Sequence, residues 1–106
     1  MIVRLVRMTL RPDAVEPFLE LYDGVAPRIR GREGCRRLEL LADARFPNIV
    51  STLSWWDHEA SLEAYRASDL FRTTWAATKV FFAAPAEAYS HIERRGDPEP
   101  VVRATG

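Results

Sequence analysis

The first residues of the chain are dominated by β-branched and aliphatic side chains. Residues 2–10 read IVRLVRMTL, and this composition predicts a β-strand. Arg11 and Pro12 end the strand, and Asp13 is expected to cap a following helix with Glu16 as its capping-box partner. The chain is therefore predicted to begin with a strand that leads directly into a helix.

The spacing of the next apolar positions is helical. One stripe repeats at intervals of three and four residues and consists of Val15, Phe18, Tyr22, Val25 and Ile29. Gly31 and Gly34 close this helical region. Pro27 would remove a hydrogen bond in the middle of the helix, so a kink or a break is predicted there.

Two further apolar runs predict strands at 35–42 (CRRLELLA) and 49–56 (IVSTLSWW). The segment between them, DARFPN at 43–48, contains the Asp, Pro and Asn residues that turns favour. We therefore expect these two strands to pair as a hairpin.

A pair of helices is expected to follow the hairpin. Asp57 is the predicted N-cap of a short helix, and Ser68 is the predicted N-cap of a second helix that Pro85 stops. The second helix would present on one face Phe71, Trp75, Thr78 and Phe82. Residues 87–93 (EAYSHIE) alternate as a last strand, and the charged, Pro- and Gly-rich segment 94–106 is expected to be a loose tail.

This order of elements predicts an α+β protein with a ferredoxin-like split βαβ fold over residues 1–93. Its four-stranded antiparallel sheet would carry the helices on one face. The third strand is apolar on both faces, with Leu53 and Trp55 on one side and Val50 and Trp56 on the other. A second sheet is needed to cover the face without helices, so a homodimer packed sheet against sheet is expected.

Composition narrows the possible partners. The chain has 106 residues, 47% of them hydrophobic, and equal numbers of basic and acidic side chains, 15 of each. A net charge of zero argues against a general binder of nucleic acids or membrane surfaces. Cys35 is the single cysteine, and no apolar run approaches the roughly 18 residues of a membrane helix. A cytoplasmic location is therefore the expectation.

Several pieces of the sequence resemble the antibiotic biosynthesis monooxygenase (ABM) family. They are EGCRRLELL at 33–41, Trp56 followed by Ser61-Leu62, and AYRASDLFRTTW at 64–75. The resemblance covers roughly residues 1–93 and implies a dimeric α/β-barrel with a ligand pocket between the sheet and the helices of each protomer. The family includes cofactor-independent oxygenases of quinols and anthrones, haem-degrading oxygenases, and many members of unknown role.

The haem-degrading branch of this family is not supported residue by residue. Trp56 matches its tryptophan, but its asparagine position falls at about Val6 and its haem-ligating histidine position is Trp75. The sequence also lacks the histidine and cysteine spacings of a metal site. No cofactor and no metal are therefore expected.

Aromatic side chains are the candidates for the pocket. Their spacing suits either core packing or an aromatic slot for a flat substrate, and they are Trp56, Tyr65, Phe71, Trp75 and Phe82. His91 is the candidate general base, on the condition that its face of the last strand looks into the pocket. His58 is expected to be exposed.

Two functions remain open at this point. One is a cofactor-independent monooxygenase that acts on an aromatic quinol or anthrone. The other is a non-catalytic dimeric module that binds a small hydrophobic ligand, or a stress-associated protein of the same fold.

Overall fold

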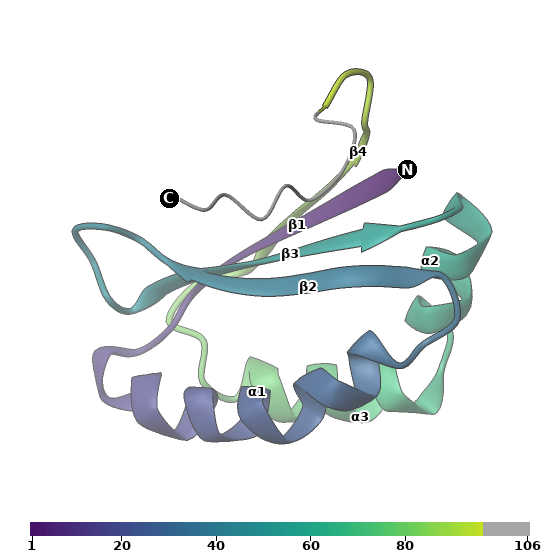
Figure 1. The fold of residues 1–106 in the computed structure, drawn as a ribbon. Coiled ribbons are helices and arrows are strands. Elements are labelled where there is room, and N and C mark those ends of the chain that lie inside the picture. Colours follow the sequence, from purple (N-terminus) through teal and green to yellow (C-terminus); the bar gives the residue numbers. More distant parts are fainter. Residues whose placement is uncertain (97–106) are drawn as a thin grey trace, which may run out of the picture.

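The computed structural model describes residues 1–96 and contains one antiparallel sheet covered on one face by helices. The strands are β1 (Ile2–Thr9), β2 (Cys35–Ala42), β3 (Ile49–Trp56) and β4 (Glu87–Ile92). The helices are a short 3-10 turn (Pro12–Ala14), α1 (Val15–Arg30), α2 (Glu59–Arg66) and α3 (Asp69–Lys79). Figure 1 shows α1 and α3 below the sheet and α2 at its right-hand end. The predicted tail over 94–106 lies, from residue 97 onward, outside the described residues.

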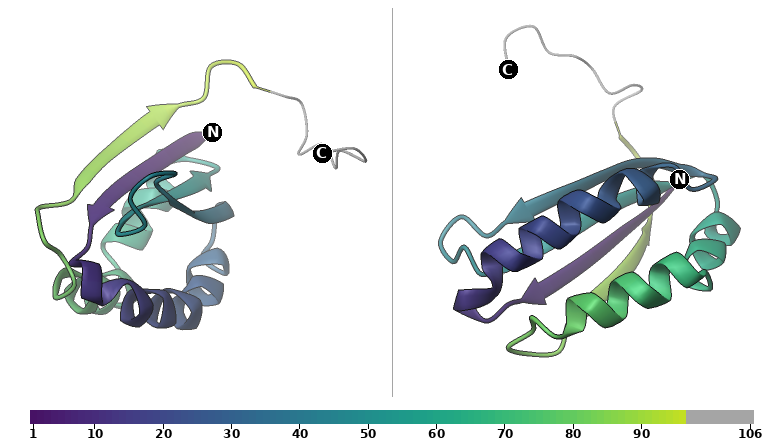
Figure 2. Two further views of the ribbon diagram at one scale, coloured as in Figure 1. Left: turned by 90° about the vertical axis from the view of Figure 1, so that its left-hand side faces the viewer. Right: turned by 90° about the horizontal axis from the view of Figure 1, so that it is seen from below.

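The strand order β2-β3-β1-β4 confirms the ferredoxin-like α+β prediction. The β2–β3 hairpin is present with the predicted strand limits, and β1 lies between β3 and β4. In Figure 2 the sheet curves over α1 and α3, which lie against the same face. This arrangement leaves the opposite face of the sheet without helices.

Strand alternation assigns each side chain of the sheet to one of two faces. On the inner face, toward the helices, Met8 and Val50 are buried and pack with Leu10 and Phe18 in one core cluster. A second cluster joins α1 to β2 through Ala26, Ile29 and Leu38. The outer face carries Val3, Leu5, Leu53, Trp55 and Tyr89 in register across β4, β1 and β3. The two-sided apolar character predicted for β3 is therefore confirmed.

Two predicted helix caps are wrong, and the break considered at Pro27 does not occur. Helix α1 starts at Val15 after the 3-10 turn, so Asp13 is not its cap and instead pairs with Arg11 at 3.4 Å. Helix α1 also continues without a break past Pro27, which is exposed, so its ring meets solvent and only one backbone hydrogen bond is lost. Asp57 does not cap α2, which begins after His58.

The reason for the Asp57 error is a tertiary ion pair. Its carboxylate accepts two hydrogen bonds from the Arg36 guanidinium, at 2.6 and 2.7 Å, and this pairing lowers the pKa of Asp57. The Ser68 cap is confirmed, because its hydroxyl accepts a hydrogen bond from the Phe71 amide. Helix α3 ends at Lys79, earlier than predicted, and Phe82 forms a β-bridge with Leu10 beyond it.

Gly34 is the backbone position on which the junction between α1 and β2 depends. Its φ is +82°, and a Cβ added there would lie 2.3 Å from Ser61 Oγ on α2. Only glycine meets both constraints without strain.

Gly34→Ala is expected to lower the free energy of unfolding by about 1–3 kcal/mol, measured by chemical denaturation. Adding Ser61→Gly should recover only part of this loss, because the positive φ remains. Gly24→Ala is the matched control. Its new Cβ meets nothing within 4 Å inside α1, so stability should rise by about 0.5–1 kcal/mol. Equal stability of Gly34→Ala and the wild type would contradict this account.

Candidate functional site

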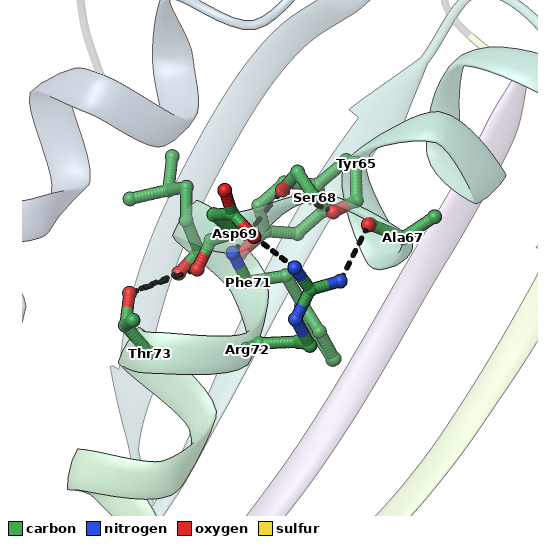
Figure 3. Close-up of polar contacts among 8 residues, drawn as sticks. Tyr65, Ala67, Ser68, Asp69, Phe71, Arg72 and Thr73 are labelled. Carbon is green, nitrogen blue, oxygen red and sulfur yellow. Dashed lines mark hydrogen bonds and ion pairs between the residues drawn. The ribbon is translucent and has the colours of Figure 1, made fainter.

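The turn between α2 and α3 positions two of the predicted pocket residues. Ser68 Oγ donates a hydrogen bond to the Tyr65 carbonyl oxygen (2.6 Å) and accepts one from the Phe71 amide (3.1 Å). Arg72 braces the same turn through the Ala67 carbonyl oxygen and an ion pair with Asp69, as Figure 3 shows. This network fixes the start of α3, so that the rings of Tyr65 and Phe71 meet edge to face with centroids 5.3 Å apart.

All five predicted aromatic residues form one continuous row. Trp56 stacks on Tyr65 with centroids 5.2 Å apart, and Phe71 stacks on Trp75 at 6.0 Å. Trp75 meets Phe82 edge to face at 5.5 Å. The row therefore runs from the end of β3, across α2 and along α3, to the turn that follows α3.

A cavity of about 350 Å³ lies between the inner face of the sheet and the helices. Three residues of the aromatic row line it: Tyr65, Phe71 and Trp75. The remaining wall is mostly apolar and includes Val6, Met8, Phe18, Leu21, Val25, Ile29, Leu38, Leu62 and Ala88. A cavity of this size with aromatic walls suits a small flat ligand.

Trp56 and Phe82 lie behind this wall and not in it. Trp56 is 0% exposed and packs beneath Tyr65, and its Nε1 donates a hydrogen bond to Ser54 Oγ at 2.9 Å. Phe82 packs against the core cluster around Leu10, because α3 ends before it. These two residues support the cavity through the rings that do line it.

The structure places His91 on the other face of the sheet. In the register of β4, His91 lies opposite Val3, whereas Ala88, which lines the cavity, lies on the inner face. His91 instead borders a shallow hollow beside α2, together with Glu59 and Glu63. The condition attached to its role as a base, that its face looks into the cavity, is therefore not met.

Hydroxyl groups supply most of the polar lining: Tyr22, Thr52, Ser54, Tyr65, Thr74 and Thr78. The Tyr22 hydroxyl is buried and has no hydrogen-bond partner within residues 1–96. Burial raises its pKa despite the opposing charge of Arg30. Burial, followed by the nearby Cys35, raises the pKa of Tyr65 to about 12, with Arg32 acting in the opposite direction. Both phenols therefore stay neutral beyond the pH at which a free tyrosine ionises, and each can donate a hydrogen bond to a ligand.

Two arginines also line the cavity, and neither was among the residues predicted from the sequence. Arg4 shares the inner face of β1 with Val6 and Met8, and Arg66 stands at the end of α2. Burial, followed by the charge of Arg66, lowers the pKa of Arg4, whereas Glu63 raises it. The alternation of residues 2–10 could have identified Arg4. Side chains of a strand alternate between its two faces, so Arg4 lies on the same face as Met8, which is buried.

Within residues 1–96, the acidic, histidine and cysteine side chains are spread over the molecule. In the part of the chain that the structure describes, no three of them lie close enough to hold a metal ion. None of the helices within residues 1–96 has both the length and the apolar character needed to cross a membrane.

The raised pKa of Tyr65 gives a direct test of the cavity environment. The folded state favours its neutral form, so its contribution to stability is intact below pH 10 and is lost as the pH rises from 10.0 to about 12. A stopped-flow pH jump, read before the protein unfolds, should show a tyrosinate component with a midpoint near 12. Tyr65→Phe should remove this component. If the component persists in the variant, the assignment is wrong.

Comparisons with known proteins agree with this geometry. Residues 1–77 match the family model of the antibiotic biosynthesis monooxygenases. A search of curated proteins finds no significant match. Among solved structures, a conserved protein from Methanosarcina mazei is similar, with 21% identity, coverage of 89% of this chain and 94% of that one, and a TM-score of 0.83.

Two further solved structures share the fold. The protein Rv0793 from Mycobacterium tuberculosis has 18% identity, coverage of 92% and 98%, and a TM-score of 0.81. A mutant of SnoaB, a cofactor-independent oxygenase from Streptomyces nogalater, has 18% identity, coverage of 92% and 97%, and a TM-score of 0.82. With a family match over 77 of its 106 residues, this chain belongs to the antibiotic biosynthesis monooxygenase family.

Proposed function

We propose that this protein is a cofactor-independent monooxygenase that acts on an electron-rich aromatic compound such as a quinol or an anthrone. The observation that carries the proposal is the cavity walled by Tyr65, Phe71 and Trp75 between the sheet and the helices. The family match supports an oxygenase, as does the fold shared with SnoaB, which is named a cofactor-independent oxygenase.

The proposed reaction uses the substrate as its own source of electrons. The substrate first loses a proton to water and then passes one electron to O₂. The two resulting radicals combine to form a C–O bond, and the peroxide anion takes a proton back from water to give a hydroperoxide. For an anthrone, the hydroperoxide formed in this way loses water and leaves a carbonyl group, so that anthrone and O₂ give anthraquinone and H₂O.

The cavity contributes position and environment to this reaction. The rings of Phe71 and Trp75 are nearly parallel, with an interplanar angle of 11°, and offer a surface on which a flat substrate can stack. The Tyr22 hydroxyl, whose proton has no acceptor within residues 1–96, can donate a hydrogen bond to an oxygen of the substrate even with the Arg30 guanidinium near its oxygen. The mostly apolar wall would also limit side reactions of the radical pair with water.

A specific observation favours the second candidate function, a non-catalytic module that binds a hydrophobic ligand. The side chains of residues 1–96 that line the cavity include no carboxylate, imidazole or thiol. A conventional general base is therefore missing from this wall. A ligand-binding module needs no such group, whereas an oxygenase must ionise its substrate in another way.

Oxygen uptake by the purified protein separates the two functions. With a small panel of naphthoquinols and anthrones, an oxygenase should give saturable uptake above the rate with heat-denatured protein. Thr74→Phe places a ring in the cavity and should lower kcat/KM by about 10-fold to 100-fold, because the substrate is displaced.

Thr73→Phe is the matched control, since Thr73 is exposed on the neighbouring position of α3 and should leave the rate unchanged. His91→Ala should also leave it unchanged. Uptake no faster than the background across the panel would reject the oxygenase and favour the binding module. Equal losses in Thr73→Phe and Thr74→Phe would place the reaction outside this cavity.

A second proposal concerns assembly. We infer that two copies pack through the outer faces of their sheets, as the apolar row of Val3, Leu5, Leu53 and Trp55 suggests. The Arg37 guanidinium lies 5.0 Å from the centre of the Trp55 ring and pairs with Glu39, so the rim of this face is charged. An apolar centre with a polar rim is the usual anatomy of a protein interface.

Trp55→Glu is expected to dissociate the dimer, because it replaces a large apolar side chain of the interface with a charged one that would have to be desolvated. Light scattering at matched concentrations should show a fall from the dimeric to the monomeric mass. Val80→Glu is the control, since Val80 is 63% exposed at the end of α3, away from the outer face of the sheet. An intact dimer in the Trp55 variant would refute the proposed packing.

A further inference from the structure

The geometry points to Arg4 as an anion-recognition group, and it assigns to the cavity an aromatic ligand that carries an oxyanion. This inference rests on the cavity being the ligand site of the proposed function. The oxyanion can be a carboxylate or an ionised ring hydroxyl, since both present the same charged oxygen to a guanidinium.

Arg4 reaches the cavity from a central strand. β1 is flanked by β3 and β4, and Arg4 lies on its inner face in the same row as Val6 and Met8, which line the same space. Its Nη1 donates a hydrogen bond to Ser90 Oγ on β4 at 2.9 Å. This bond ties the guanidinium to the edge strand.

Most N–H donors of the Arg4 guanidinium have no acceptor among the described residues. A guanidinium has five N–H donors, and within residues 1–96 the Ser90 hydroxyl is the one acceptor that Arg4 engages. No carboxylate of the described residues lies within ion-pairing distance of it. A half-buried guanidinium without a carboxylate partner is costly unless an anion joins it.

The charges around Arg4 also favour the binding of an anion. Arg66 lines the same cavity and is already paired with Glu63, with Nη1 and Oε1 3.1 Å apart. Of the three side chains that act on one another here, two are cations and one is an anion. Among the described residues, Arg4, Arg66 and Glu63 together carry one net positive charge at this end of the cavity, beside its aromatic wall.

An oxyanion on the ligand would complete this arrangement. It would accept hydrogen bonds from the free donors of Arg4 while the aromatic rings of the ligand lie against Phe71 and Trp75. In an oxygenase, the same contact would favour the ionised form of a ring hydroxyl and so lower the pKa of the ligand. That effect would replace the general base that the described lining lacks.

The test compares two probes that share one shape and differ in charge, 2-naphthoate and 2-naphthamide. Their dissociation constants are measured by isothermal titration calorimetry at neutral pH. Arg4→Gln should weaken the binding of naphthoate by about tenfold or more, because a charge-assisted hydrogen bond is lost. Binding of the neutral amide should change by no more than about twofold, since its aromatic contacts persist.

Three further variants serve as controls. Arg7→Gln removes the same charge from the same strand but on the outer face, and it should leave both probes unaffected once light scattering confirms an unchanged oligomeric state. Ser90→Ala removes the hydroxyl that Arg4 engages and should keep the preference for naphthoate. Arg4→Lys keeps the positive charge but loses the planar set of N–H donors of the guanidinium. It should therefore lose only part of the preference for naphthoate.

A third probe, 2-naphthol, separates the two sources of the oxyanion. Tighter binding above the pKa of the free naphthol than below it, lost in Arg4→Gln, would support an ionised hydroxyl as the ligand group. A preference confined to naphthoate would support a carboxylated ligand. Either result supports an anion site at Arg4.

The inference is overturned if Arg4→Gln weakens both naphthoate and naphthamide equally, or neither of them. Should that variant not fold, the wild-type protein still decides, because added salt must weaken naphthoate binding and spare naphthamide. These probes do not react with O₂. A protein that lacks oxygen uptake but prefers naphthoate through Arg4 would therefore reject the proposed oxygenase and support the anion site.

Discussion

The burial of Trp56 at the end of β3 is the contact on which the cavity depends. Its ring is fully covered, its Nε1 is satisfied by Ser54 Oγ, and Tyr65 stacks on it from α2. Each following ring rests on the one before it, as far as Phe82. Because packed rings leave little room for rearrangement, this row sets the distance of α2 and α3 from the sheet and thereby the width of the cavity.

The phenol and guanidinium groups in its wall determine which chemistry the cavity can support. Its phenols are held neutral by burial, and its charged groups are guanidiniums. Such a site is poor at removing a proton directly but favours a ligand that has already lost one. Neutral phenols together with guanidiniums suit an oxygenase whose substrate ionises readily. They suit equally well a binding module for an anionic aromatic compound. The absence of an imidazole or carboxylate from the described lining separates this site from conventional acid–base catalysis.

The two faces of the sheet have different roles. The side chains of one parity on β1 and β3 build the core and the cavity, and those of the other parity form the apolar outer face. A shift of one residue in register would exchange the two sets, so the pairing of β1 with β3 is tightly constrained. Gly34 and Ser61 add a second constraint by fixing the close approach of the start of β2 to α2.

The sequence by itself determined the order of the elements, the limits of β2 and β3 and the membership of the aromatic row. These features depend on local composition and spacing, which a single chain displays directly. The Ser68 cap was predictable for the same reason, since its partner, the Phe71 amide, is three residues away. Tertiary structure decided the features whose partners are distant in sequence. Asp57 could cap a helix or bind Arg36, and the folded chain selects the ion pair because β2 brings the guanidinium within 2.6 Å.

The same reason explains what the sequence left open at the site. Whether His91 lies on the same face of β4 as Ala88, which lines the cavity, depends on the pairing of β4 with β1. The spacing of residues 87–93 suits either parity. Arg4 became a candidate only when its neighbours on β4 and α2 were known. Sequence patterns specify which side chains share a face, but long-range strand pairing decides which face encloses the cavity, because only that pairing fixes what lies on each side.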